Sequence, residues 1–215
     1  MNKIIIFGLG DLAEQMNFFL EQCSDVAGFT VDDEYVKESV FNGKDVVPFS
    51  QLAKTYPCDE YEICLTVGYS KMNKNRGEKA ALLKSMGYKL TTYIHPTAVN
   101  SASEIGEGCL IMENSTIGAF ARLGIANIVR PGSMISHHTA VGNFNYFAPC
   151  SCIAGSVTVG SNCFFGLNCT VKNRVTVADF TLVGAGAYIS KDTEKFGVYA
   201  PARTVKLEKN SMDIM

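Results

Sequence analysis

The sequence predicts a protein in two parts, a small parallel α/β domain followed by a solenoid of six-residue repeats. The first part, about 90 residues long, alternates short apolar runs with segments of helical periodicity, which is typical of strand–helix–strand units. From Val99 onward, an apolar residue recurs at every sixth position as far as Ile189. The change of period indicates a change of architecture near residue 95.

Length and composition restrict the class of protein. The chain has 215 residues, of which 47% are hydrophobic and 19% charged, with a formal net charge of -2. A net charge this close to zero and slightly negative does not favour binding to nucleic acid or to an anionic membrane. The apolar run after Lys3 is too short for a secretory signal, and no segment reaches the roughly 20 apolar residues of a membrane span. We therefore expect a cytoplasmic protein.

The eight cysteines are expected to be reduced thiols. Their spacing contains no C-x-x-C pair, so the pattern of a zinc site is absent and we expect no metal. Cys109, Cys163 and Cys169 fall on small-residue positions of the repeat, where cysteine acts as a compact hydrophobic side chain.

The α/β part is predicted element by element from its apolar spacing. We expect strands over residues 3–7, 26–31, 44–47, 62–67 and 89–94, and helices over residues 11–23, 48–56 and 76–86. Ser50 is placed to cap the second helix at its N-terminus, and Gly87 follows the last helix as its C′ residue.

The solenoid is predicted from sixteen consecutive apolar positions without an insertion. They are Val99, Ile105, Ile111, Ile117, Leu123, Val129, Ile135, Val141, Phe147, Ile153, Val159, Phe165, Val171, Val177, Val183 and Ile189. The residue directly after each apolar position is often glycine, and the fourth residue after each apolar position is usually small. An apolar side chain pointing to the axis of a prism, with a small one beside it near a corner, explains both features.

The hexads resemble the left-handed parallel β-helix of hexapeptide-repeat acyltransferases. From "IIIFGLGDLAE" to "GVYAPAR", the chain resembles nucleotide-sugar acyltransferases of the bacillosamine N-acetyltransferase and sialic acid O-acetyltransferase type. The resemblance implies a Rossmann-like nucleotide-sugar-binding domain over residues 1–95. It also implies a left-handed β-helix acyltransferase domain with a C-terminal tail over residues 96–215, with 18 residues per coil, and a homotrimer.

The function that this resemblance implies is acyl transfer from acyl-CoA, with acetyl-CoA as the expected donor substrate. The acceptor would be an amino or hydroxyl group of a nucleotide-linked sugar, used in surface glycan biosynthesis. The sugar, the nucleotide and the choice between N- and O-transfer stay open.

Two of the three histidines stand together in "ISHHTAVG", as the second and third residues after Ile135. Acyl transfer from a thioester requires a base that removes a proton from the nucleophile, and imidazole suits this near neutral pH. The residues alone leave a solvated turn as the alternative. The resemblance implies that His137 is the general base, in segments similar to "VEHDCxIG", although His138 replaces the usual acid. Because a one-residue slip exchanges the two rings, either of them is a candidate.

Two further positions depart from the family pattern. Tyr146 replaces a histidine that is common nine residues after the base, and Arg130 replaces an asparagine seven residues before it. These changes bear on the acceptor rather than on the thioester chemistry. His95, in "YIHPTA", is interpreted as a structural residue at the turn into the solenoid.

The acceptor site is predicted at "GLGDLA", a G-x-G-x-x-A pattern between a strand and a helix, and at the acidic pair that ends the next strand. "GYSKMNKNR" either meets a diphosphate or sugar or is a solvated helix start. The acceptor-binding candidates are Gly8, Gly10, Asp11, Asp32, Asp33, Lys71, Asn73 and Tyr146. A nicotinamide-dependent enzyme is a rival interpretation, but fewer than 100 residues precede the solenoid, which favours one nucleotide over two.

The acyl-CoA is expected along the solenoid toward its C-terminal end, between neighbouring prisms. The candidates are Gly155, which stacks one coil beyond His137, together with Leu167, Gly184, Ala185, Gly186 and Arg203. Small residues would let pantetheine approach the backbone, and Arg203 would meet a CoA phosphate. Simple repeat geometry is the alternative explanation for the glycines.

Two other functions fit the same fold. A noncatalytic sugar-nucleotide-binding scaffold would keep the solenoid without releasing CoA. A zinc hydratase would need three histidines around one metal ion, and His95 precedes the solenoid, so that ligand set is missing.

Overall fold

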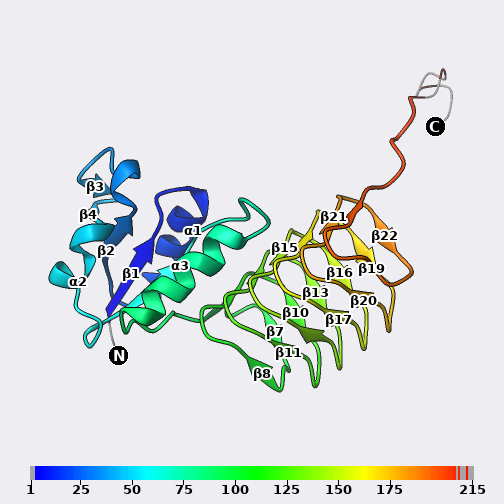
Figure 1. The fold of residues 1–215 in the computed structure, drawn as a ribbon, viewed down its shortest axis with the longest axis horizontal. Helices are drawn as coiled ribbons and strands as arrows, with labels where there is room; N and C mark the ends of the chain where they lie inside the picture. The colour runs from blue at the N-terminus through cyan, green and yellow to red at the C-terminus, as the bar shows by residue number, and fades with distance from the viewer. Residues whose placement is uncertain (1–2, 207, 209–211, 213–215) are drawn as a thin grey trace.

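The computed structural model describes residues 3–206, 208 and 212. An α/β domain lies at one end, a stack of short strands forms the other, and the chain beyond the last strand leads away from the solenoid (Figure 1). Among the described residues, no helix has the length and hydropathy that a membrane-spanning helix needs.

The α/β domain is a five-stranded sheet in the order β3-β4-β2-β1-β5. Its strands are β1 (Lys3–Phe7), β2 (Val26–Val31), β3 (Val40–Phe41), β4 (Lys44–Pro48) and β5 (Tyr61–Leu65). All pairings are parallel except that of the edge strand β3. The carboxyl ends of β1, β2 and β5 therefore meet at one edge of the sheet, where ligands of parallel sheets bind.

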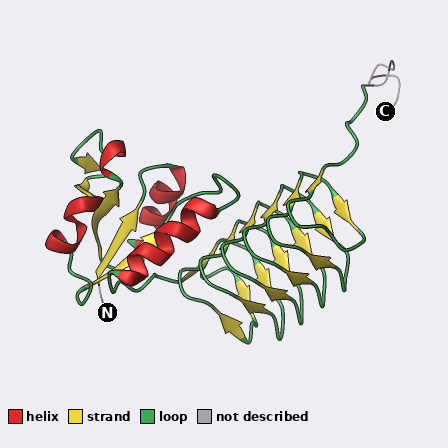
Figure 2. Cartoon of the chain, viewed as in Figure 1, coloured by secondary structure: helices red, strands yellow, loops and turns green. Residues whose placement is uncertain are grey.

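Helices cover both faces of this sheet (Figure 2). They are α1 (Asp11–Leu20), the 3-10 turns η1 (Asp33–Tyr35) and η2 (Phe49–Gln51), α2 (Leu52–Thr55) and α3 (Lys74–Ser85). Met16 of α1 packs with Ile4 and Ile6 on one face, whereas Leu83 of α3 packs with Ile5 on the other. Alternate residues of β1 thus enter two different cores, as the pleat of a strand requires.

The strands at 3–7 and 26–31 are confirmed residue for residue. The first helix ends at Leu20, before the predicted residue 23. Ser50 does not cap a helix: it lies inside η2, and its N–H donates to Asp33 Oδ1 over 3.0 Å. Gly87 has φ +93° just after α3, and its N–H donates to Lys84 O, which confirms the predicted end of the helix.

The solenoid is a prism with three parallel sheets as its faces. Face A contains β7 (Val99–Asn100), β10 (Thr116–Ile117), β13 (Met134–Ile135), β16 (Cys152–Ile153), β19 (Thr170–Val171) and β22 (Tyr188–Ile189). Face B contains β8 (Glu104–Ile105), β11 (Arg122–Leu123), β14 (Ala140–Val141), β17 (Thr158–Val159) and β20 (Thr176–Val177). Face C contains β6 (Tyr93–Ile94), β9 (Leu110–Ile111), β12 (Ile128–Val129), β15 (Tyr146–Phe147), β18 (Phe164–Phe165), β21 (Leu182–Val183) and β23 (Val198–Tyr199).

Coils stack with a repeat of 18 residues, as predicted. Ile117 pairs with Ile135 and Ile135 with Ile153, so identical positions of the hexad lie above one another. From β9 to β22, the second residue of each strand points into the prism and is buried, and the Phe147 and Phe165 rings stack there at 4.7 Å. The repeat of apolar residues therefore forms one continuous core.

The prediction for the start of the repeat is wrong by one residue. Val99 pairs with Thr116, whereas Asn100 pairs with Ile117, and the Val99 side chain is 59% exposed. Ala98 packs against the core in its place. Ile94 pairs with Ile111 and Asn100 with Ile117, whereas Ile105 pairs with Leu123, so the missing residue lies at the corner between β7 and β8.

The predicted strand at 89–94 is also different in the structure. Leu90 makes only an isolated bridge to Ile63 of the α/β sheet. Tyr93 and Ile94 form β6, which pairs with β9 on face C, so this segment opens the solenoid rather than closing the α/β sheet.

The corners of the prism repeat a left-handed backbone residue every six positions. Those with a side chain are Asn114, Phe120, Ala126, His138, Phe144, Cys150, Ser156, Asn162, Asn168, Arg174 and Phe180. Residues with a Cβ adopt positive φ reluctantly, so the tight corner imposes it. His138, with φ 56°, is one of these residues.

Candidate active site

The paired histidines lie on the edge between faces A and B, between β13 and β14. Both are exposed, and their Nδ1 atoms are 3.1 Å apart. Because a hydrogen bond between two imidazole nitrogens needs one N–H and one lone pair, one ring donates and the other accepts. The Phe120 ring, one coil earlier, lies 4.8 Å from the His138 ring.

Gly155 makes the space in which the His137 ring lies. A Cβ at residue 155 would stand 2.5 Å from both Cε1 and Nε2 of His137, which no real contact allows. Within the described part of the chain, the N–H of Gly155 has no hydrogen-bond acceptor. The edge therefore combines an exposed imidazole with a buried glycine whose N–H has no acceptor among the described residues, and acyl transfer uses such groups for the proton and for the oxyanion.

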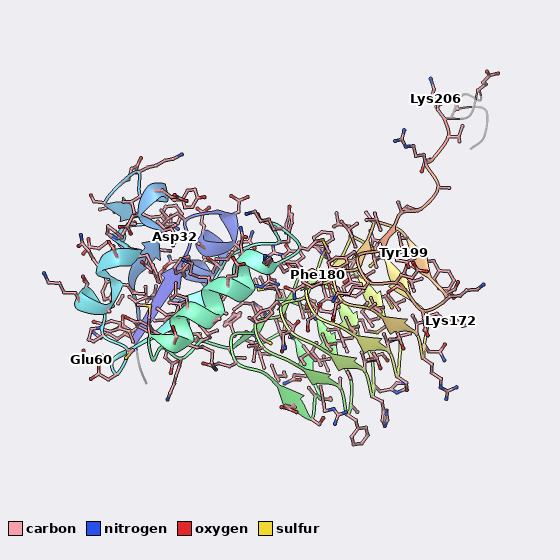
Figure 3. The ribbon with its side chains drawn as sticks, in the orientation of Figure 1. Asp32, Glu60, Lys172, Phe180, Tyr199 and Lys206 are labelled. Atoms are coloured by element: carbon pink, nitrogen blue, oxygen red, sulfur yellow. The ribbon has the colours of Figure 1, made fainter. Side chains whose placement is uncertain are left out.

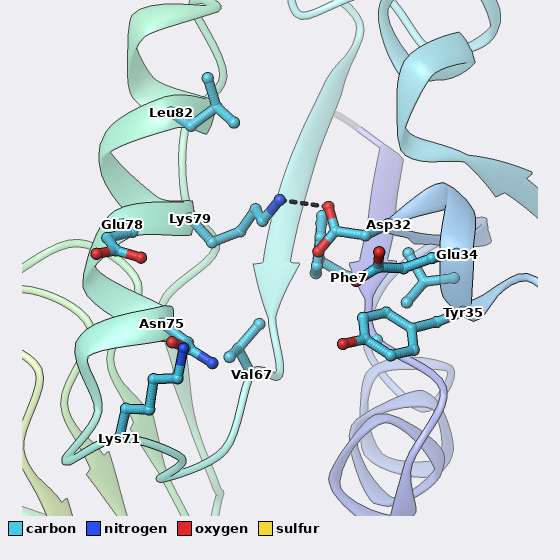
Figure 4. Close-up of a pocket in the computed structure, with 12 residues that line it drawn as sticks. Phe7, Asp32, Glu34, Tyr35, Val67, Lys71, Asn75, Glu78, Lys79 and Leu82 are labelled. Atoms are coloured by element: carbon cyan, nitrogen blue, oxygen red, sulfur yellow. Dashed lines mark hydrogen bonds and ion pairs between the residues drawn. The ribbon is translucent and has the colours of Figure 1, made fainter.

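A second site lies at the carboxyl edge of the α/β sheet, in a cleft of about 560 Å³ (Figure 4). Three predicted acceptor residues line it: Gly8, Asp32 and Lys71. Lys79 was not predicted; its Nζ lies 2.5 Å from Asp32 Oδ1. The same ammonium lies 4.2 Å from the centre of the Phe49 ring. The sequence carries no signal for this pair, because α3 brings Lys79 to a strand end 47 residues away.

Two predicted acceptor residues have other partners. The hydrogen bonds from Ser50 lower the pKa of Asp33, and this carboxylate fixes η2 rather than lining the cleft. Asn73 is fully buried, and its Nδ2 donates to Cys163 O over 2.9 Å. We therefore assign Asp33 and Asn73 to the scaffold instead of to the acceptor.

Gly10 and Asp11 are exposed at the start of α1, and neither lines the cleft at the sheet edge. Asp11 instead borders a shallow hollow beside Phe18 and Phe19. The two glycines of the G-x-G pattern therefore have different places: Gly8 lines the main cleft, whereas Gly10 is the N-cap residue of α1.

Tyr146 lies on face C, in a cluster of three aromatic rings. Its ring centre is 5.0 Å from that of Tyr69 and 5.5 Å from that of Phe164. Burial raises the pKa of the Tyr146 hydroxyl. The cluster connects the loop after β5 to the solenoid. No pattern in the sequence predicts that Tyr69 contacts Tyr146.

The predicted acyl-CoA residues other than Gly155 lie on another edge of the prism. Leu167, Gly184, Ala185 and Gly186 follow β18 and β21, so they belong to the edge between faces C and A. Leu167 is 51% exposed, and Arg203 is exposed on the segment beyond β23. One chain does not bring this set together with His137.

The cleft and the histidine pair are also apart within one chain. The α/β domain packs on face C, where Tyr93, Leu110 and Ile128 share a core with α1, whereas the A–B edge lies opposite face C. Lys172 follows β19 and therefore lies on the same edge of the prism as the histidines. Figure 3 shows Asp32 in the α/β domain and Lys172 in the part of the solenoid that is far from that domain. A shared active site therefore needs a second copy of the chain.

No protein-family model matches the sequence, and no curated protein matches it. Solved structures do. A mutant of perosamine N-acetyltransferase from Caulobacter crescentus in complex with CoA and GDP-perosamine is 25% identical, with a TM-score of 0.85 over 94% of each chain. The acetyltransferase domain of PglB from Neisseria gonorrhoeae is 23% identical, with a TM-score of 0.83 over 94% of this chain and 97% of that chain.

WeeI from Acinetobacter baumannii has the same fold, at 17% identity and a TM-score of 0.82 over 92% of this chain and 96% of that chain. These likenesses span both the α/β domain and the solenoid. In fold and architecture the chain therefore resembles these nucleotide-sugar acetyltransferases, and the resemblance inferred from its sequence is confirmed.

Proposed function

We propose that the chain transfers the acetyl group of acetyl-CoA to an amino or hydroxyl group of a nucleotide-linked sugar. The observation that carries this function is the exposed His137 ring against Gly155. It occurs in a fold shared with perosamine N-acetyltransferase, whose structure contains CoA and GDP-perosamine. Such a reaction in the cytoplasm would supply acetylated sugars for surface glycans.

In this mechanism, His137 acts through Nε2. Its Nδ1–H donates to His138 Nδ1, which leaves the Nε2 lone pair free for a proton. The acceptor's amine or hydroxyl attacks the thioester carbonyl while Nε2 takes its proton. The free N–H of Gly155 is placed to stabilise the oxyanion. When the C–S bond breaks, the CoA thiolate leaves with the proton from the imidazolium.

The acceptor would bind in the cleft of the α/β domain, which we interpret as a small Rossmann-like domain over residues 1–95 preceding a left-handed β-helix over 96–215. Gly8 lines the cleft as glycine because it has φ +130° and because a Cβ there would lie 2.5 Å from Thr66 Oγ1. Lys71 and Lys79 line the cleft, and their ammonium groups suit a diphosphate.

A homotrimer would complete the site. The outward residues of face A carry no charge: Val99, Thr116, Met134, Cys152, Thr170 and Tyr188. Such a face suits packing against a second prism, and cyclic symmetry lets one interface serve all copies. The His137 edge of one chain would then approach both the C–A edge, with Gly184 to Gly186, and the cleft of another.

The test is incubation with acetyl-CoA and a panel of UDP-, dTDP-, GDP- and CMP-linked amino sugars, with detection of free thiol and of the acetylated product. Thiol release that depends on one nucleotide sugar is expected. A folded protein that binds a nucleotide sugar and releases no CoA with any of them would be a noncatalytic scaffold.

A further inference from the structure

Arg76, at the start of α3, is a fully buried guanidinium. Among the described residues it pairs with no carboxylate; backbone carbonyls alone accept its hydrogen bonds. Burial lowers the pKa of the Arg76 side chain to about 9, so it remains charged at neutral pH. A buried charge without a partner ion is costly, and such a group persists where it holds surrounding structure in place.

The carbonyls come from both domains. On the α/β side, Nη1 donates to Val67 O over 3.3 Å and to Gly68 O over 2.9 Å, just beyond the end of β5. On the solenoid side, Nε donates to Ala126 O, while Nη2 donates to Phe144 O and Asn145 O, over 2.8 to 3.0 Å. These three belong to the edge between faces B and C. One side chain thus joins the rim of the cleft to two coils of the prism.

The loop between β5 and α3 is held at a second point. Lys71, Met72 and Asn73 all have positive φ, at 49°, 53° and 62°. Consecutive left-handed residues with side chains are unfavourable and persist only where surrounding contacts impose them. Asn73 supplies such a contact through its bond to Cys163 O, one coil beyond the carbonyl of Asn145 that Arg76 binds.

We propose that Arg76 and Asn73 are positioning residues through which the solenoid sets the shape of the acceptor cleft. They hold loop 68–73 in its left-handed conformation, and this conformation places Lys71 on the cleft wall. The inference rests on the proposed function only in identifying the cleft with the acceptor. The acyl donor binds elsewhere in that proposal, so disturbance of the loop should affect the acceptor alone.

The first test measures amide hydrogen exchange in residues 68–73 of the ligand-free protein. Arg76→Met removes all five hydrogen bonds, and Asn73→Gly removes the bond to Cys163 while tolerating positive φ. Both should speed exchange in this loop by about tenfold or more, because opening of the loop no longer breaks these bonds. Lys74→Met, which removes an exposed cation from the same helix turn, is the matched control and should leave exchange unchanged.

The second test is kinetic. In Arg76→Met and Asn73→Gly, the KM for the nucleotide sugar should rise by about tenfold to a hundredfold, since small misplacements of binding groups have effects of this size. The KM for acetyl-CoA should stay within about twofold of the wild-type value. Arg76→Lys should recover part of the loss, because an ammonium reaches some of the same carbonyls.

Unchanged exchange in both variants would overturn the proposal, as would equal rises in both Michaelis constants. If Arg76→Met does not fold, Asn73→Gly and Arg76→Lys decide the question. If the wild type transfers no acetyl group, the proposed function fails. The hydrogen-exchange measurement on the ligand-free protein still tests whether the solenoid holds loop 68–73 in place.

Discussion

His138 shows how one residue serves both the fold and the site. Its backbone adopts the left-handed conformation that the corner demands, and its ring lies 3.1 Å from that of His137. A carboxylate at this place would accept a hydrogen bond from Nδ1–H of His137. In the proposed mechanism the Nδ1 lone pair of His138 accepts it instead, which requires the N–H of His138 to be at Nε2.

His137→Ala should reduce turnover by about 10² to 10⁴, the usual effect of removing a general base. His138→Asn keeps a residue that tolerates positive φ and should cost less, because it changes the orientation of the base and not the base itself. Thiol release under saturating substrates measures both, with CoA affinity and melting temperature as controls for folding. Near-wild-type activity in both variants would exclude this pair from the chemistry.

Gly155→Ala should lower kcat although it adds one methyl group. That carbon would lie 2.5 Å from His137 Nε2, so the ring has to leave its position. Larger side chains, as in Gly155→Leu, should also raise the KM for acetyl-CoA if the donor passes this edge. Ser156→Ala, at the adjacent corner residue, adds no atom near the ring and should behave as the wild type. A fully active Gly155→Ala would mean that the observed His137 position is not the catalytic one.

At the scale of the strands, the register of the first coil can be tested directly. Ile117 is fully buried in the prism, so Ile117→Ala should lower the free energy of unfolding by about 2–5 kcal/mol. Val99→Ala should change it by less than Ile117→Ala does, because the Val99 side chain points out of the prism and leaves no cavity in its core. Denaturant unfolding of both variants measures this contrast. Equal losses would place Val99 in the core, as the uninterrupted hexad pattern predicts.

Glu107 joins the end of α3 to the first coil and should make stability depend on pH. Burial raises the pKa of this carboxyl, but hydrogen bonds from Lys84 and from the Leu90 N–H outweigh burial, so the pKa lies below its ordinary value. The carboxylate therefore stabilises the fold fully above the unfolded-state value near 4.5, and this stabilisation is lost as the pH falls through the lowered pKa.

The corresponding variant is Glu107→Gln. Its melting temperature should lie below that of the wild type at pH 7, and the gap should narrow as the pH is lowered below about 4. Glu60→Gln, at an exposed turn, is the control and should show no such dependence. A gap that stays constant across this range would show that the charge of Glu107 contributes nothing.

At the level of the whole molecule, the proposed function requires assembly, because the cleft and the histidine edge are separate in one chain. Light scattering should give three times the 23.3 kDa chain mass. Met134→Glu places a charge on uncharged face A and should dissociate the trimer and abolish transfer, whereas Thr158→Glu on face B should do less. A wild-type monomer that is fully active would contradict an active site shared between chains.

Whereas the family resemblance supplied the 18-residue coil, the six-residue period was enough to predict the solenoid, the inward residues from Ile105 onward and the place of the histidine pair at a corner. These follow from local periodicity, because each hexad meets only the hexads directly before and after it in the stack. The ends of β1 and β2 were predictable for a similar reason, since short buried strands are bounded by turn residues.

The remaining contacts arise from tertiary packing. Lys79 meets Asp32, Arg76 binds carbonyls of two coils, and Tyr69 meets Tyr146, each across tens of residues and between elements of different period. The burial of Asn73 has the same origin. The contacts of Arg76, Tyr69 and Asn73 depend on how the α/β domain packs against the solenoid, and that packing arises from the fit of two surfaces, which no repeat in the chain encodes.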